Sequence, residues 1–180
     1  ALLWFIAPFA SSAADTVLAY ICPLALLLVL LWVSGKAAMR LGGKDAAMPA
    51  MILPAFSLIT MAEFAPGRLD HHSVQILLAF GMLYFSMRAL ERPRFAIGAG
   101  VAGAIALAIG IEGLPLVITT AMAFGLAWVG NARHAPALRA FGISFALATI
   151  AVLLIGVPPS RWFTPAYDAI SIVYAGAATL

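Results

Sequence analysis

Charged residues are scarce in this chain. Only 9% of its 180 residues are Asp, Glu, Lys or Arg, whereas 64% are hydrophobic. A water-soluble domain carries about 25% charged residues, so the charge available here is too small to cover a surface that faces water. Lipid is therefore the expected surrounding of most of the chain. The small net charge of +3 gives no indication of a nucleic-acid partner.

Cysteine, sequence repeats and a leader pattern are also lacking. The single Cys22 cannot form an internal disulfide, and within an apolar run it is expected to behave as a small hydrophobic group. No repeat with a period of roughly 20–50 residues is visible. The first ten residues have neither the basic region nor the small-residue cleavage site of a signal peptide.

What is present is a series of long apolar runs. They predict an all-α fold, a polytopic bundle of transmembrane helices in one domain over residues 1–180. A helix needs about 20 apolar residues to cross about 30 Å of hydrocarbon at about 1.5 Å per residue. The predicted spans are residues 16–34, 46–62, 71–88, 95–111, 114–130 and 141–157, and a seventh at 169–180 that is cut short. The Gly- and Ala-rich residues 98–104 suit close packing of helices.

Both ends of the chain suggest a piece of a longer protein. Residues 2–9 are apolar but too few to span, so they are either the tail of a truncated span or a short helix that lies flat at the membrane interface, and we favour the flat helix. The chain begins without a methionine and stops within an apolar run. We therefore expect a fragment of a larger membrane protein.

Basic residues are distributed unevenly among the predicted loops. Alternate loops carry eight of the ten, and the opposite loops carry only Arg68 and Arg161. The eight are Lys36, Arg40, Lys44, Arg88, Arg92, Arg94, Arg133 and Arg139. The positive-inside rule places the loops with these eight residues in the cytoplasm. Five of the seven acidic residues, Asp70 and Glu112 among them, then face the non-cytoplasmic side.

One short stretch, residues 65–75 (APGRLDHHSVQ), concentrates polar side chains between two apolar runs. It holds Arg68, Asp70, His71, His72 and Gln75. Ionisable groups beside hydrocarbon are costly, so they are interpreted as functional by default. This stretch is the candidate site.

Two interpretations of Asp70 are open. Asp is a preferred N-cap residue, so its carboxylate could accept the amide hydrogen of His72 or Ser73. Alternatively, Asp70 faces an outer cavity and binds a metal ion, an acceptor group or both, since carboxylates suit Mg²⁺ and Mn²⁺. The adjacent His71 and His72 point about 100° apart on a helix, so at most one of them is expected to join Asp70.

Three further residues complete the candidate site. Arg68 could bind phosphate, contact lipid headgroups or pair with Asp70 or Glu63. Gln75 lies one turn after His71 and could hold it by a hydrogen bond, or act in helix packing. Glu112 sits at a turn between two apolar spans without a polar neighbour in the sequence, which favours a functional role.

A second polar loop gives a weaker indication. It contains Arg161 and Asp168, together with Trp162 and Tyr167. Because Trp and Tyr are enriched at membrane interfaces in any case, this loop alone does not indicate a site.

Three segments of the chain resemble a known family. They are residues 66–75 (PGRLDHHSVQ), residues 107–115 (LAIGIEGLP) and residues 167–171 (YDAIS). They are similar to a group of bacterial multi-span proteins that resemble the GT-C glycosyltransferases and, more distantly, the catalytic subunits of oligosaccharyltransferases.

The resemblance implies transfer of a sugar from a polyprenyl-phosphate-linked donor at the non-cytoplasmic face, which is the periplasmic face of a bacterial inner membrane. Asp70 matches the acidic residue of the second of two acidic motifs, and His72 stands where some members have a second Asp. The first motif is expected upstream of residue 1, so the fragment alone is expected to be inactive. The implied partners are membrane lipid and the polyprenyl-linked donor.

The resemblance also implies roles for the candidate residues. The expected catalytic residues are Asp70, His71, His72 and Glu112, and the expected substrate-binding residues are Arg68, Gln75, Arg161 and Asp168. Asp70 and His72 would be the ligands of a divalent cation, Mg²⁺ or Mn²⁺.

A secondary transporter or proton-coupled permease is the alternative. Asp70, His71, His72 and Glu112 would then form an ion relay. Transporters usually place such groups near the bilayer midplane and contain inverted repeats. Here the groups cluster at one face and no repeat is visible, which favours the enzyme. A membrane scaffold without activity would leave the polar cluster unexplained.

Overall fold

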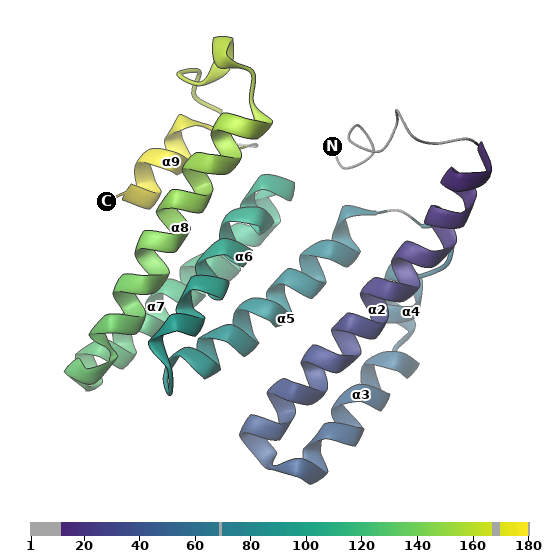
Figure 1. The fold of residues 1–180 in the computed structure, drawn as a ribbon. Helices are drawn as coiled ribbons and strands as arrows, with labels where there is room; N and C mark the ends of the chain where they lie inside the picture. The colour runs from purple at the N-terminus through teal and green to yellow at the C-terminus, as the bar shows by residue number, and fades with distance from the viewer. Residues whose placement is uncertain (1–11, 69, 167–169, 180) are drawn as a thin grey trace.

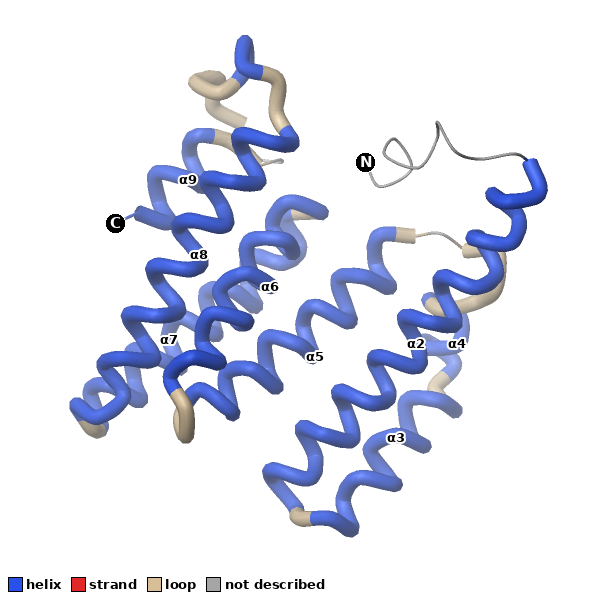
Figure 2. Tube along the Cα trace, viewed as in Figure 1, coloured by secondary structure: helices blue, strands red, loops and turns tan. Residues whose placement is uncertain are grey.

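The computed structural model describes residues 12–68, 70–166 and 170–179, and the regular secondary structure of these residues is helical (Figures 1 and 2). The α-helices are α2 (Ser12–Gly42), α3 (Ala47–Phe56), α4 (Leu58–Glu63), α5 (His71–Ala89), α6 (Ala96–Ile109), α7 (Leu114–Gly130), α8 (Ala135–Gly156) and α9 (Ile172–Thr179). Short 3₁₀ turns join several of them: η2 (Lys44–Ala46), η3 (Pro93–Phe95), η4 (Ile111–Gly113), η5 (Ala132–His134) and η6 (Pro159–Arg161). The all-α prediction is confirmed. The interfacial helix predicted over residues 2–9 lies outside the described residues.

Three helical segments are long and apolar enough to cross a membrane, which indicates a membrane protein. They are Thr16–Gly42, Ile111–Gly130 and Ala132–Gly156. The segment Pro93–Ile109 is apolar but shorter. α5 has 19 residues, but His71, His72 and Gln75 make its first two turns polar and Arg88 lies in its last turn. Six spans therefore stay a prediction, of which the structure supports three.

The single helix predicted for residues 46–62 is not formed. α3 ends at Phe56, Ser57 is extended (φ −72°, ψ 126°), and α4 follows with six residues. Pro54 lies in the last turn of α3 and has no N–H to donate within the helix, which weakens the helix there. At about 1.5 Å per residue, neither piece is long enough to cross a bilayer alone.

Other boundaries also differ from the predicted ones. α2 continues to Gly42 rather than ending at residue 34, and α8 begins at Ala135 rather than 141. Both extensions contain charged residues that a search for apolar runs excludes but a helix accommodates. At the C-terminal end, α9 covers Ile172–Thr179 of the predicted span 169–180.

α6 is the centre of the later part of the bundle. It packs between α5 and α8, while α2 packs against α3 and α5 (Figure 1). Eight residues of α6 are buried, all of them Ala or Gly except Leu107. Their small side chains let α6 approach both neighbours closely, as the Gly- and Ala-rich sequence predicts.

Gly100 marks the closest approach of α6 to α8. A Cβ at this position would lie 2.8 Å from the carbonyl oxygen of Phe141 and 2.8 Å from the nitrogen of Phe145, and it would overlap the hydroxyl of Ser144. The Ser144 hydroxyl donates to the Phe141 carbonyl at 3.0 Å. No side chain larger than hydrogen fits here without separating the two helices.

The loops gather at two ends of the bundle. The turns after α2, α5 and α7 lie at one end, and those after α4, α6 and α8 lie at the other (Figure 1). Arg40, near the end of α2, contacts Glu91, just after α5, at 2.6 Å. The eight basic residues therefore share one end, here called the basic end, as the alternation of loops predicts.

We expect Gly100→Ala to lower the free energy of unfolding by about 1–3 kcal/mol, because the added methyl group overpacks the contact of α6 with α8. The measurement is unfolding of the purified protein in detergent. Gly142→Ala in α8 is the matched control, since a Cβ there meets no atom within 4 Å. Equal loss of stability in both variants would contradict the close approach at Gly100.

Candidate functional site

The loop between α4 and α5 is fixed to the rest of the fold at two points. Phe64 is buried, and it anchors the beginning of the loop. The N–H of Gly67 donates to the carbonyl of Ala19 in α2 at 3.0 Å. Gly67 has a φ of 89°, which only glycine adopts readily, so the turn that makes this contact requires glycine. The loop thus presents the polar stretch at the end opposite the basic end.

Asp70 occupies the N-cap position of α5, but its carboxylate makes no capping hydrogen bond. It instead accepts a hydrogen bond from Nη2 of Arg68 at 3.1 Å, and its other oxygen lies 2.8 Å from Nδ1 of His71. The Ser73 hydroxyl donates to the backbone carbonyl of Asp70 at 2.9 Å and keeps the residue in place. The carboxylate is therefore directed to other side chains and not to the helix.

The guanidinium of Arg68 beside Asp70 holds the pKa of that carboxyl below its ordinary value. The nearby amides of His71 and His72 and the imidazole of His72 add to this effect, and partial desolvation opposes it. Asp70 is consequently ionised at neutral pH, as a metal ligand or hydrogen-bond acceptor requires.

Glu63, which the sequence offered as a possible partner of Arg68 but not as a catalytic, substrate-binding or metal-binding residue, belongs to the site. Its Oε2 lies 3.2 Å from Nη2 of Arg68, which also contacts Asp70, so one guanidinium forms ion pairs with two carboxylates. A second nitrogen of Arg68 donates to the carbonyl of Ala62 at 3.2 Å. Oε2 of Glu63 is buried without a hydrogen bond of good geometry. Glu63 ends α4, and only the turn after it shows that it faces the Arg68 side chain.

His71 and His72 both join Asp70, so the prediction that at most one does so is wrong. Their rings lie with centroids 4.1 Å apart and are tilted by 36°. One ligand atom from each of Asp70, His71 and His72 can be chosen so that all lie within 4.8 Å of one another. The extended backbone of Asp70 returns its carboxylate towards the first turn of α5, where both imidazoles reach it.

Glu112 lies beside the first turns of α5, far from it in sequence. Nε2 of Gln75 donates to Oε2 of Glu112 at 3.1 Å, so Gln75 holds Glu112 rather than His71. A Cβ on Gly110 would overlap the Glu112 carboxylate and lie 2.8 Å from Nε2 of Gln75. The missing side chain of Gly110 therefore makes room for this contact.

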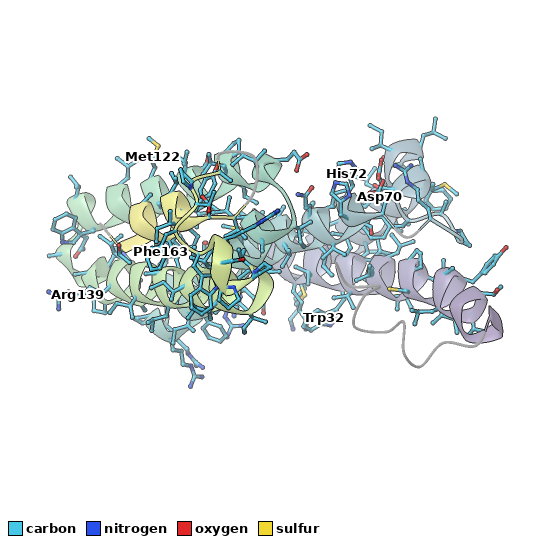
Figure 3. The ribbon with its side chains drawn as sticks, turned by 90° about the horizontal axis from the view of Figure 1, so that it is seen from above. Trp32, Asp70, His72, Met122, Arg139 and Phe163 are labelled. Atoms are coloured by element: carbon cyan, nitrogen blue, oxygen red, sulfur yellow. The ribbon has the colours of Figure 1, made fainter. Side chains whose placement is uncertain are left out.

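The second polar loop does not join this group in the described residues. Arg161 is exposed at the end of η6, and Asp168 lies outside the described residues. Figure 3 shows Asp70 and His72 together, well separated from Phe163 in the loop after α8. No contact joins Arg161 to the Asp70 group in the described residues, so its substrate-binding role stays a prediction.

The donor set fits a divalent cation. Asp70 offers an oxygen, and His71 and His72 each offer a nitrogen. Two imidazoles shift the preference from Mg²⁺ towards Mn²⁺ and later transition metals. The partial exposure of the three side chains leaves positions for water or substrate.

Comparison of the chain with protein-family models, curated proteins and solved structures finds no match. Functional conclusions therefore depend on the residues and their geometry.

We expect Arg68→Gln to raise the pKa of Asp70 towards its ordinary value, because the neutral amide no longer stabilises the carboxylate. In the wild type, the depressed pKa means that the Arg68–Asp70 interaction is present at neutral pH and is lost as the pH falls through that lowered pKa. A carboxyl-carbon NMR titration in detergent micelles measures the change. Arg161→Gln serves as the control and should leave Asp70 unaltered. An identical Asp70 titration in Arg68→Gln would show that the contact is not formed.

Proposed function

We propose that this chain is part of a GT-C-like glycosyltransferase that transfers a sugar from a polyprenyl-phosphate-linked donor. The reaction would take place at the non-cytoplasmic face of the membrane, the periplasmic face in a bacterial inner membrane. One observation carries the proposal: Asp70 and both histidines converge at the end of the helices opposite the basic end. Arg68 forms an ion pair with Asp70, and Gln75, one turn after His71 in α5, donates a hydrogen bond to Glu112.

Arg68 would bind the phosphate of the donor lipid. Its guanidinium already contacts anionic oxygens of Glu63 and Asp70, and phosphate presents similar oxygens to the same donors. Binding a phosphate would release the two carboxylates from Arg68. Asp70 would then be available to a cation or to the acceptor.

Asp70 and His72, with His71 beside them, would hold a divalent cation, Mn²⁺ or Mg²⁺. Such a cation neutralises the charge that develops on a departing phosphate. The acceptor nucleophile forms a bond to the anomeric carbon while the bond from that carbon to the phosphate oxygen breaks, and the electron pair leaves with the phosphate. The proton of the acceptor would pass to the Asp70 carboxylate.

Glu112 would orient the reacting groups. Gln75 fixes one oxygen of its carboxylate by a hydrogen bond. The exposed carboxylate can accept hydrogen bonds from hydroxyl groups of the sugar or the acceptor. Glu63, near the same guanidinium, would keep Arg68 in position between donor molecules.

The positions of these groups favour surface chemistry over an ion relay. Asp70 precedes α5 and Glu112 lies in η4 between α6 and α7, so both are at helix ends. A relay across the bilayer needs ionisable groups along the helices, near the midplane. The same end placement suits an enzyme whose donor headgroup lies at the membrane surface.

In the full-length protein, Asp70→Asn should reduce sugar transfer by about 100-fold or more, since it removes the charged oxygen at the reacting phosphate. Release of polyprenyl phosphate from a panel of polyprenyl-phosphate hexoses is the readout. Asp45→Asn, at the basic end, is the matched control and should keep full activity. Unchanged transfer in Asp70→Asn would remove this residue from the mechanism, and no release with any donor would contradict the reaction.

His72→Ala should weaken Mn²⁺ binding by at least about tenfold, because one ligand is lost. Electron paramagnetic resonance of free and bound Mn²⁺ measures the affinity in the detergent-solubilised full-length protein. The control is His134→Ala, a histidine at the basic end. Equal affinity in wild type and His72→Ala would show that His72 is not a ligand.

A further inference from the structure

A concave site lies at the basic end, away from the residues of the proposed reaction. Its cavity of about 430 Å³ lies between the α5–α6 loop and the α7–α8 loop. That volume falls in the range of roughly 300–1,000 Å³ that is typical of small-molecule sites. The lining residues are Ala89, Leu90, Glu91, Pro93, Arg133, His134 and Ala137.

The cavity combines an apolar floor with a basic rim. Ala89 and Ala137 are fully buried and belong to the core between α5, α6, α7 and α8. Arg133 and His134 lie on the rim. Nε of Arg133 donates to His134 at 3.2 Å, and this leaves the terminal guanidinium nitrogens of Arg133 without a partner in the described part of the chain. Those nitrogens have the geometry that binds two oxygens of one phosphate.

Glu91, the one acidic residue in the lining, does not repel an anion. Nη1 of Arg40 lies 2.6 Å from both carboxylate oxygens of Glu91, so the charge of Glu91 is already paired. Eight of the ten Lys and Arg residues lie at this end, against two acidic residues, Asp45 and Glu91. The potential around the cavity is therefore positive.

The surroundings of the cavity point to a lipid instead of a soluble anion. Leu90, on the wall, is 47% exposed, and Val129, in the last turn of α7, is 76% exposed. Trp128 beside it is half exposed, and Trp is typical of the membrane interface. Exposed apolar side chains thus occur both in the lining of the cavity, at Leu90, and at the end of α7 that leads to Arg133.

We propose that this cavity binds the headgroup of an anionic phospholipid, with the phosphate at Arg133 and His134 and the glycerol beside Leu90. Basic pockets at the ends of membrane helices recognise anionic headgroups in this way. The inference is independent of the proposed glycosyltransferase, because no residue of the Asp70 group takes part in it. A lipid held here would tie the α5–α6 loop to the α7–α8 loop.

Native mass spectrometry of the detergent-solubilised protein tests this proposal. Phosphatidylglycerol is compared with phosphatidylcholine of the same acyl chains, and preferential binding of phosphatidylglycerol is expected. Arg133→Gln should weaken phosphatidylglycerol binding about fivefold, the contribution of one basic residue at an anionic lipid surface. Glu91→Gln should strengthen it, because Arg40 loses its carboxylate partner and adds an unpaired positive charge beside the cavity.

Three controls separate the cavity from general charge effects and from misfolding. Arg92→Gln removes a basic residue at the same end that does not line the cavity, and it should bind as the wild type does. Arg133→Lys keeps the charge and should retain most of the preference. The melting temperature of Arg133→Gln without lipid should equal that of the wild type, because the Arg133 side chain is exposed.

Several results would overturn the proposal. Equal binding of the two lipids would exclude headgroup recognition, and equal loss in Arg92→Gln and Arg133→Gln would show diffuse charge instead of a site. Added inorganic phosphate or glycerol 3-phosphate should not displace phosphatidylglycerol at equal concentration. Displacement by either would mean that the cavity binds a soluble anion and not a lipid.

Discussion

The constraint on which this structure depends is the cost of placing an ionisable group against hydrocarbon. In the described residues, the carboxylates of Asp45, Glu63, Asp70, Glu91 and Glu112 all lie at or beyond helix ends. The three at the non-basic end also have polar partners. Arg68 forms ion pairs with Glu63 and Asp70, and Gln75 donates a hydrogen bond to Glu112. Chemistry is thereby confined to the two ends of an otherwise apolar bundle.

Helix packing in the core determines where the residues of the candidate site lie. α6 carries Ala and Gly where it meets α5 and α8, so its axis lies close to both. That close packing brings the α6–α7 turn to the first turns of α5, where Gly110 leaves room for Glu112 to contact Gln75. A larger residue at a buried position of α6 would therefore displace Glu112, because it would move the α6–α7 turn.

The two ends of the bundle have opposite chemistry. One end gathers carboxylates and imidazoles around a single guanidinium, an arrangement that could hold a metal ion. The other gathers guanidinium groups around a small cavity, with its one carboxylate already paired to Arg40. Each end of the bundle would face a phosphate layer of the bilayer, and the two ends present different side chains to it.

The sequence by itself determined the helical class, the alternation of basic and acidic loops, and the polar stretch around Asp70, because these depend on composition and on the spacing of apolar runs. The break at Ser57 was not predicted, since residues 46–62 carry no charge and a proline such as Pro54 is tolerated within membrane helices. Only the tertiary structure decided that both histidines reach Asp70, that Glu63 shares Arg68, and that Gln75 holds Glu112. Those contacts depend on how loops fold back and how closely helices pack, and neither is encoded in a local pattern.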